Sequence, residues 1–122
     1  MNEISTLLYV DDEPLNLRLF TFNFRKKFSV ITSESGFDGL TKLKLHPEIA
    51  VVISDMKMPG MSGIEFVMEA KKEFPDIAYF ILTGFDITSE IADALKKGII
   101  YKYFRKPFNF KEVEASIIEV IN

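Results

Sequence analysis

The sequence predicts an α/β fold, in which a five-stranded doubly wound parallel sheet carries helices on both faces. Two observations lead to this prediction. Five short apolar runs rich in β-forming residues alternate strictly with longer amphipathic stretches along the 122 residues. Three of these runs are almost wholly apolar, as expected for strands that are buried on both faces of a parallel sheet.

The five strands are predicted from the apolar runs. In chain order they are "TLLYV" (6–10), "FSVITS" (28–33), "IAVVIS" (49–54), "IAYFIL" (77–82) and "IIYKYF" (99–104). The second run contains Ser29, Thr32 and Ser33, and the fifth contains Lys102, so we place these two strands at the edges of the sheet. With right-handed crossovers, the strand order is then 2-1-3-4-5, as in flavodoxin-like folds.

The helices are predicted between and after the strands, at residues 14–26, 37–46, 63–73, 87–97 and 109–121. Pro14 suits the first turn of the first helix. On that helix Phe20 and Phe24 share a face and are expected in the core, whereas Phe22 points elsewhere. His46, which precedes a proline, is expected to cap the C-terminus of the second helix.

Signals for the later helices are of the same kind. Gly60 and Gly63 interrupt the chain between the third strand and the third helix. Gly98 suits a stop after "ALKK" in the fourth helix. The fifth helix carries one apolar stripe, formed by Val113, Ile117, Ile118 and Ile121.

The composition indicates a single soluble globular domain that spans residues 1–122. Apolar residues make up 48% and charged residues 27% of the chain, which argues against disorder. The net charge of −3 gives no reason to expect nucleic-acid binding, and the lack of cysteine excludes disulfides and thiolate chemistry. No apolar stretch approaches the roughly 20 residues of a membrane span, and the N-terminus lacks a signal-peptide pattern, so a cytoplasmic location is expected.

Polar residues follow four of the predicted strands at the point where each strand ends. Asp11 and Asp12 follow the first strand, Asp55 follows the third, Thr83 the fourth and Lys106 the fifth. In an open parallel sheet, ligands bind beyond the carboxyl ends of the strands, near the point where the strand order reverses. The predicted strand order therefore brings three carboxylates, a hydroxyl and an ammonium group into one shallow cleft.

This set of groups is suited to Mg²⁺ and to a phosphoryl group. Three clustered carboxylates repel one another, and oxygen ligands without histidine or cysteine favour Mg²⁺ or Mn²⁺. The ion and Lys106 together offset the acids and can neutralise phosphoryl oxygens, while Thr83 donates a hydrogen bond. An aspartate can itself be the nucleophile and form an acyl phosphate. Gly60 and Gly63 then suggest a loop that passes close to the phosphoryl group.

Each of these residues also has a purely structural interpretation. Asp11 and Asp12 stand where they could cap the first helix, and Asp55 could be a turn residue. Thr83 and Lys106 carry almost no information alone. Their joint occurrence at the ends of four strands favours the functional interpretation.

Four motifs resemble those of response-regulator receiver domains: "YVDDEP", "SDMKMPGMSGIEF", "ILTGF" and "YFRKPF". They occur in matching order and spacing, and the resemblance covers essentially the whole chain, residues 1–122. The resemblance implies a phosphoacceptor signalling switch rather than an enzyme. In such a switch a histidine kinase or a phosphotransfer protein gives a phosphoryl group to one aspartate in a Mg²⁺-dependent reaction.

The resemblance also assigns roles residue by residue. It implies that Asp55 is the phosphoacceptor. Asp12 would be a direct metal ligand, Asp11 a ligand that often acts through water, and Lys57 a metal contact through its backbone carbonyl. Thr83 would follow the phosphoryl group, Lys106 would form an ion pair with it, and Tyr103 would be the aromatic switch. It further implies that the peptide bond before Pro107 is often cis. The fourth helix, fifth strand and fifth helix would contact an effector domain or a second copy.

Two alternative functions remain at this stage. A Mg²⁺-dependent phosphohydrolase with an aspartyl nucleophile usually needs an acid two residues after the nucleophile, where this chain has Lys57. A degenerate receiver used only for binding would not need the complete set of acids. In the family, Lys57 and Phe85 occupy positions that influence how water reaches the acyl phosphate, although both can also be ordinary surface residues.

Overall fold

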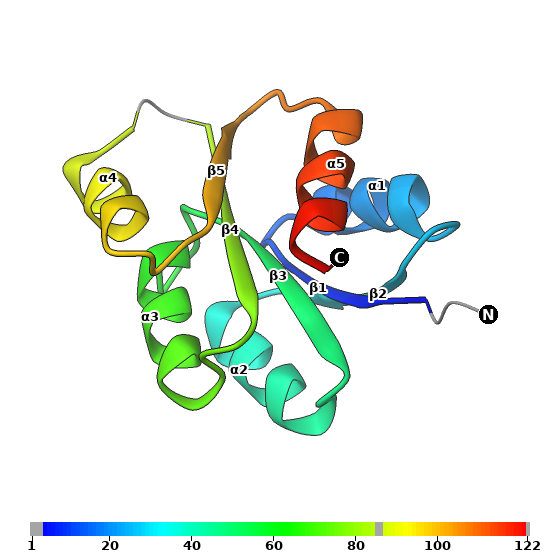
Figure 1. The fold of residues 1–122 in the computed structure, drawn as a ribbon, viewed down its shortest axis with the longest axis horizontal. Helices are drawn as coiled ribbons and strands as arrows, with labels where there is room; N and C mark the ends of the chain where they lie inside the picture. Colours follow the sequence, from blue (N-terminus) through cyan, green and yellow to red (C-terminus); the bar gives the residue numbers. More distant parts are fainter. Residues whose placement is uncertain (1–3, 85–86, 122) are drawn as a thin grey trace.

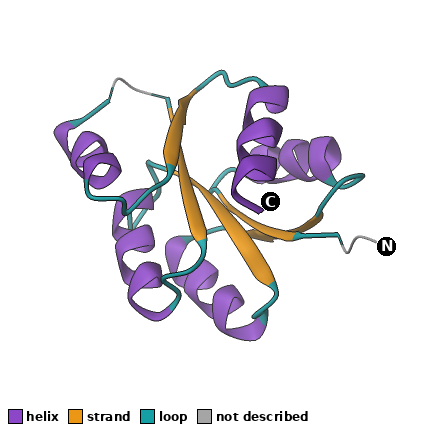
Figure 2. Cartoon of the chain, viewed as in Figure 1, coloured by secondary structure: helices purple, strands orange, loops and turns teal. Residues whose placement is uncertain are grey.

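The computed structural model describes residues 4–84 and 87–121. Five strands alternate with five helices along this part of the chain, as predicted. Their bounds are β1 (Thr6–Val10), α1 (Pro14–Phe24), β2 (Ser29–Ser33), α2 (Gly36–Leu45), β3 (Ile49–Asp55), α3 (Gly63–Glu73), β4 (Ala78–Thr83), α4 (Ser89–Lys96), β5 (Lys102–Arg105) and α5 (Phe110–Ile121). The strands form a central layer between two layers of helices (Figures 1 and 2).

The sheet has the order β2-β1-β3-β4-β5, which confirms the predicted order. All four pairings are parallel. β2 and β5 form the edges, and Ser29 and Lys102 at these edges are exposed, in agreement with their polar character. Parallel pairing places the carboxyl ends of all five strands at the same edge of the sheet.

Two hydrophobic cores fill the space between the sheet and the helices. Helices α1 and α5 cover one face, and α2, α3 and α4 cover the other (Figure 1). Successive residues of β1 serve opposite cores, because side chains alternate along a strand: Leu7 and Tyr9 pack under α1 and α5, and Leu8 and Val10 under the other helices.

The three phenylalanines of α1 lie where the helical spacing places them. Phe20 and Phe24 are buried in the core beneath α1, and their rings pack against each other with centroids 4.4 Å apart. Phe22 is 64% exposed on the outer face of the helix. The predicted division of this helix into a core face and an outer face is therefore confirmed.

Local capping explains where the other helices begin and end. Ser62 and Glu65 form a reciprocal capping box at the start of α3. Ser35 caps the N-terminus of α2, and Thr88 caps that of α4. Helix α4 therefore begins at Ser89, whereas the sequence predicts a start at residue 87. His46 is the C-terminal cap residue of α2, as predicted.

Strand β5 begins three residues later than the apolar run from residue 99 predicts. Gly98 has a positive φ of 74°, and the backbone N–H groups of Ile99 and Ile100 both donate to the carbonyl of Ala94. These N–H groups close the end of α4 and cannot pair with β4. Ile100 is nevertheless buried, which explains why the run is apolar.

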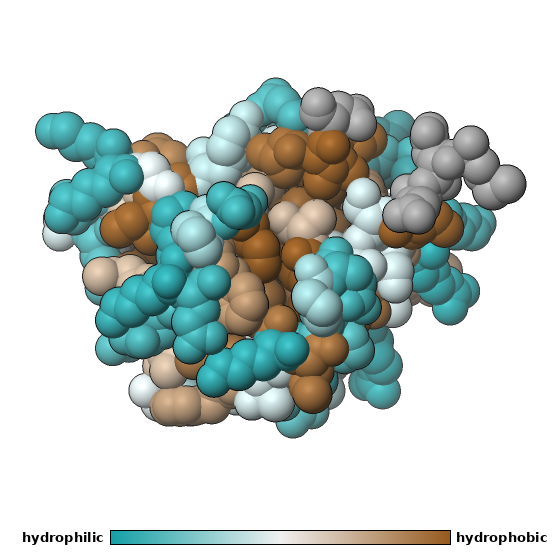
Figure 3. All heavy atoms as spheres, turned by 60° about the horizontal axis from the view of Figure 1, so that its bottom comes forward, coloured by the Kyte–Doolittle hydropathy of each residue, from teal (hydrophilic) through white to brown (hydrophobic). Residues whose placement is uncertain are grey.

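Apolar side chains gather at the edge of the sheet opposite the carboxyl ends (Figure 3). Figure 3, which brings the bottom of Figure 1 forward, shows hydrophobic side chains gathered between hydrophilic flanks. A hollow there is lined by residues before and at the start of β3 and β4 and by the end of α5. They include the apolar Pro47, Phe74 and Val120 and the acidic Glu73 and Asp76. Within the described ranges, no helix is long and apolar enough to cross a membrane.

Candidate functional site

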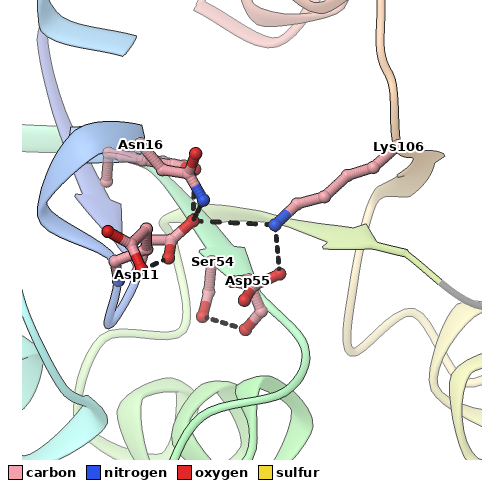
Figure 4. Close-up of polar contacts among 7 residues, drawn as sticks. Asp11, Asn16, Ser54, Asp55 and Lys106 are labelled. Carbon is pink, nitrogen blue, oxygen red and sulfur yellow. Dashed lines mark hydrogen bonds and ion pairs between the residues drawn. The ribbon is translucent and has the colours of Figure 1, made fainter. Parts of the chain in front are cut away.

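The predicted polar residues meet at the carboxyl edge of the sheet. Asp11 follows β1, Asp55 ends β3, Thr83 ends β4 and Lys106 follows β5. In Figure 4 the side chain of Lys106 extends across this edge toward the carboxylates of Asp11 and Asp55. Residues that are up to 95 positions apart in the sequence, from Asp11 to Lys106, thus form one cluster.

Asp11 lies at the centre of a hydrogen-bond network and is only 1% exposed. Its Oδ1 accepts a hydrogen bond from the backbone N–H of Glu13 at 2.9 Å. Its Oδ2 accepts one from the Tyr9 hydroxyl at 2.7 Å and one from Asn16 Nδ2 at 3.2 Å. The capping alternative is therefore wrong for Asp11 and Asp12, because the N-cap residue of α1 is Glu13 and Asp11 fixes the turn before it.

Tyr9 and Asn16 also contact Asp11, although neither was predicted as a site residue. A signal for Tyr9 was present, because residues two apart on a strand face the same side, which places Tyr9 beside Asp11. Burial, followed by the charge of Asp11, raises the pKa of Tyr9 above its ordinary value, so its hydroxyl remains a donor. Asn16 lies in the first turn of α1, and no pattern in the sequence pointed to its contact with Asp11.

Asp55 is paired with Lys106. The Nζ atom of Lys106 lies 2.8 Å from Asp55 Oδ1 and 3.7 Å from Asp11 Oδ2. Burial raises the pKa of Asp55 above its ordinary value, although the hydrogen bond and charge of Lys106 act in the opposite direction. The backbone supports this pair: Lys106 N–H donates to the Thr83 carbonyl at 2.7 Å, and the peptide bond between Lys106 and Pro107 is cis, as predicted.

The three acids fit a hard divalent cation. A carboxylate oxygen from each of Asp11, Asp12 and Asp55 lies within 4.8 Å of the others, and among the described residues this is the only such group of acids, histidines and cysteines. Asp12 is exposed, so the cluster is open to solvent on one side. Three negative charges against one Lys106 leave a net charge near −2, which suits Mg²⁺ with its preference for oxygen ligands.

The loop between β3 and α3 is held tightly against Asp55. The N–H of Gly63 donates to the Met56 carbonyl at 2.7 Å, and a Cβ atom on Gly63 would lie 2.3 Å from the Asp55 carbonyl oxygen. Gly60 adopts a positive φ of 81°, which favours glycine. The need for Gly63 is thus set by close packing on the backbone of Asp55. Lys57 lies exposed in this loop.

Thr83 and Tyr103 occupy neighbouring strands. Thr83 is buried at the end of β4 and lies opposite Arg105 of β5 in the register. Tyr103 is half-buried and packs against the core beneath α2, α3 and α4. Phe85, which the sequence analysis connected with water access, lies outside the described residues.

Comparisons with known proteins agree with this fold. The family "Response regulator receiver domain" matches residues 7–118. The hydrogenase transcriptional regulatory protein HoxA of Cupriavidus necator is 30% identical over 104 residues, which cover 85% of this chain and 21% of HoxA. The heme response regulator HssR of Staphylococcus saprophyticus is 33% identical over 119 residues, which cover 97% of this chain and 52% of HssR.

The solved structures include a response regulator receiver domain protein from Clostridium thermocellum, which is 34% identical to this chain with a TM-score of 0.91. The alignment covers 98% of this chain and 95% of that one. The chain therefore belongs to the response regulator receiver family, which acts in two-component signalling. It spans about a fifth of the length of HoxA and about half that of HssR.

Proposed function

We propose that this domain, residues 1–122, is a phosphoacceptor switch of a two-component system and that Asp55 is the acceptor. A histidine kinase or a phosphotransfer protein would supply the phosphoryl group in a Mg²⁺-dependent reaction in the cytoplasm. The observation that carries the proposal is the ion pair between Lys106 Nζ and Asp55 Oδ1 at 2.8 Å, inside a cluster of three acids.

The surroundings of the three acids favour Asp55 as the nucleophile. Asp11 is buried and already accepts three hydrogen bonds, whereas Asp12 is exposed to solvent. Lys106 holds Oδ1 of Asp55, and we expect the other carboxylate oxygen to attack. That oxygen forms a bond to phosphorus while the bond from phosphorus to the donor's imidazole nitrogen breaks, and the imidazole leaves with the electron pair.

The other residues of the cluster would support this transfer. Asp11, Asp12 and Asp55, with the backbone carbonyl of Lys57, would hold Mg²⁺, and the bound ion would neutralise charge on the phosphoryl oxygens. Lys106 is placed to pair with a phosphoryl oxygen after transfer, since its ammonium already touches Asp55. Thr83 would donate its hydroxyl to the phosphoryl group.

The proposed output is a change of surface around β5. Movement of Thr83 toward the phosphoryl group would make room for Tyr103 and alter the face formed by α4, β5 and α5. Exposed apolar side chains on and beside these elements, Leu95, Tyr101 and Ile118, suit contact with an effector domain or a second copy. The net charge of −3 gives no support for nucleic-acid binding by this domain.

A phosphohydrolase is the weaker alternative. Its leaving group would need an acid two residues after the nucleophile, and that position is Lys57. We therefore infer a switch that is modified once per signal rather than an enzyme that turns over a substrate.

Phosphorylation with a small donor tests the acceptor. Incubated with Mg²⁺ and acetyl phosphate, the protein should gain one phosphoryl group by intact mass, and peptide mapping should locate it on Asp55. Asp55→Asn should remove the label. Asp93→Asn alters an exposed aspartate on α4 that pairs with Lys97, and this variant should keep the label. Full labelling of Asp55→Asn would refute the assignment.

A further inference from the structure

The hydroxyl of Tyr9 points into the acid cluster from the core and takes no part in the proposed phosphoryl transfer. Tyr9 is 1% exposed, and its ring stacks on Phe20 with centroids 4.0 Å apart and planes 4° from parallel. The ring is therefore fixed between β1 and α1. From this position its hydroxyl donates a 2.7 Å hydrogen bond to Asp11 Oδ2.

The hydrogen bonds on Asp11 are distributed unevenly between its two oxygens. Oδ2 accepts from Tyr9 and Asn16 and also lies 3.7 Å from Lys106 Nζ. Among the described residues, only the backbone N–H of Glu13 donates to Oδ1. A carboxylate has about four lone-pair sites, two on each oxygen. The protein thus fills both sites of Oδ2 and leaves one site of Oδ1 for a cation or its bound water.

We propose that Tyr9 is a positioning residue that restricts Asp11 to a single available oxygen and thereby favours Mg²⁺ over Ca²⁺. This inference rests on the proposed function, in which Asp11, Asp12 and Asp55 hold Mg²⁺. Ca²⁺ takes six to eight oxygen ligands and often binds both oxygens of a carboxylate, whereas Mg²⁺ keeps a small octahedral shell that includes water. If only Oδ1 of Asp11 is available, Asp11 can give one ligand atom to Mg²⁺ but cannot bind Ca²⁺ through both of its oxygens.

Tyr9→Phe isolates the hydrogen bond, because phenylalanine keeps the ring that stacks on Phe20. Asn16→Ala removes the second donor to Oδ2 and alters only a half-buried side chain, so it tests the same idea in a protein whose core is unchanged. Tyr79→Phe is the matched control. Tyr79 is equally buried, and its hydroxyl donates to the Phe74 carbonyl at 2.9 Å, away from the acids.

Calorimetric titration of the ion-free protein with MgCl₂ and with CaCl₂ measures the selectivity without any phosphodonor. We expect Tyr9→Phe to lower the preference for Mg²⁺ over Ca²⁺ by about threefold or more, mainly through tighter Ca²⁺ binding. Asn16→Ala should move the ratio in the same direction, and the double variant further. Tyr79→Phe should leave the ratio unchanged even if it lowers the stability of the fold.

The outcomes separate this inference from the proposed function. If the wild type prefers Mg²⁺ and the ratio is the same in Tyr9→Phe and Asn16→Ala, the role of Tyr9 is overturned while the metal site stands. An equal loss of affinity for both ions in Tyr9→Phe also overturns it, because that result indicates a purely structural side chain. A wild type that binds neither ion overturns both this inference and the metal part of the proposed function.

Discussion

Lys106 Nζ and Asp55 Oδ1 are 2.8 Å apart, and the two side chains are 27% and 11% exposed. The pair forms where the end of β5 approaches the end of β3, across β4. Its attraction does not fully offset the burial of the carboxylate, because the pKa of Asp55 remains raised with desolvation as the largest cause. In the absence of a cation, the charge on Asp55 therefore costs folding free energy.

The first prediction follows from this cost. Asp55→Asn should raise the Tm of the metal-free protein at neutral pH, because asparagine fills the same space without a buried charge. Thermal unfolding followed by circular dichroism measures the change. A Tm below that of the wild type at neutral pH would mean that the ion pair with Lys106 outweighs desolvation.

The same prediction has a definite pH dependence. Between the ordinary value of 3.8 and the raised pKa, folded wild-type protein binds a proton on Asp55 that the unfolded chain has released. This contribution to stability is present at low pH and is lost as the pH rises through the raised pKa. The difference in Tm between Asp55→Asn and the wild type should therefore be largest above the raised pKa and should decrease as the pH falls below it.

The second prediction separates the two neighbouring acids. Asp12→Ala should weaken Mg²⁺ binding by about tenfold or more with little effect on stability, since Asp12 is exposed. Asp11→Ala should weaken binding less, but it should lower the free energy of unfolding by about 1–3 kcal/mol, because it leaves the Tyr9 hydroxyl without its partner. Mg²⁺ titration and denaturant unfolding measure the two effects. Unchanged Mg²⁺ affinity in both variants would contradict the acid site.

Much of this arrangement could be predicted from the sequence. Strict alternation and edge polarity were enough for the strand order, and the residue after each apolar run was enough to bring Asp11, Asp55 and Lys106 together. The start of β5 could not be predicted, because the end of α4 competes for the N–H groups of Ile99 and Ile100. That competition depends on backbone geometry rather than on hydrophobicity.

Some tertiary contacts of the site could not be predicted from the sequence either. Tyr9 is part of an apolar strand, and its hydroxyl became informative only when Asp11 Oδ2 was found 2.7 Å away. The sequence suggests that Gly60 and Gly63 form a loop close to the phosphoryl group, but it does not predict the close contact between Gly63 and the backbone of Asp55. Such close approaches are set by tertiary packing.

The third prediction concerns this close approach. Gly63→Ala would place a Cβ atom 2.3 Å from the Asp55 carbonyl oxygen and 3.0 Å from Met56 Cα, so the backbone must shift. We expect a loss of about 1–3 kcal/mol in the free energy of unfolding together with slower phosphorylation of Asp55. Gly84→Ala is the control, because no described residue apart from its neighbour in the chain lies within 4 Å of its added Cβ atom. Urea unfolding of both variants would show whether the contact matters; equal stability would contradict it.

The last prediction concerns how the cluster changes a distant surface. A phosphoryl group on Asp55 brings roughly two negative charges, which movable donors must meet. Thr83 is followed by Gly84, where an added Cβ atom would meet none of the other described residues within 4 Å, so the end of β4 can shift at low steric cost. Tyr103 on β5 lies opposite Ile81 on β4, and Ile81 comes two residues before Thr83 on β4. Tyr103 is therefore placed to fill the space that Thr83 vacates.

Beryllofluoride with Mg²⁺ stands in for the phosphoryl group in the test. Because a ligand shifts a two-state equilibrium only by its differential affinity, we expect perturbed amide NMR signals at Thr83 and Tyr103 and along α4, well beyond Asp55. Tyr103→Ala should reduce the changes along α4 while leaving those near Asp55, and Asp55→Asn should abolish all of them. If only the signals of residues next to the ligand change, the switch hypothesis is wrong and the domain is a phosphoryl acceptor without a conformational switch.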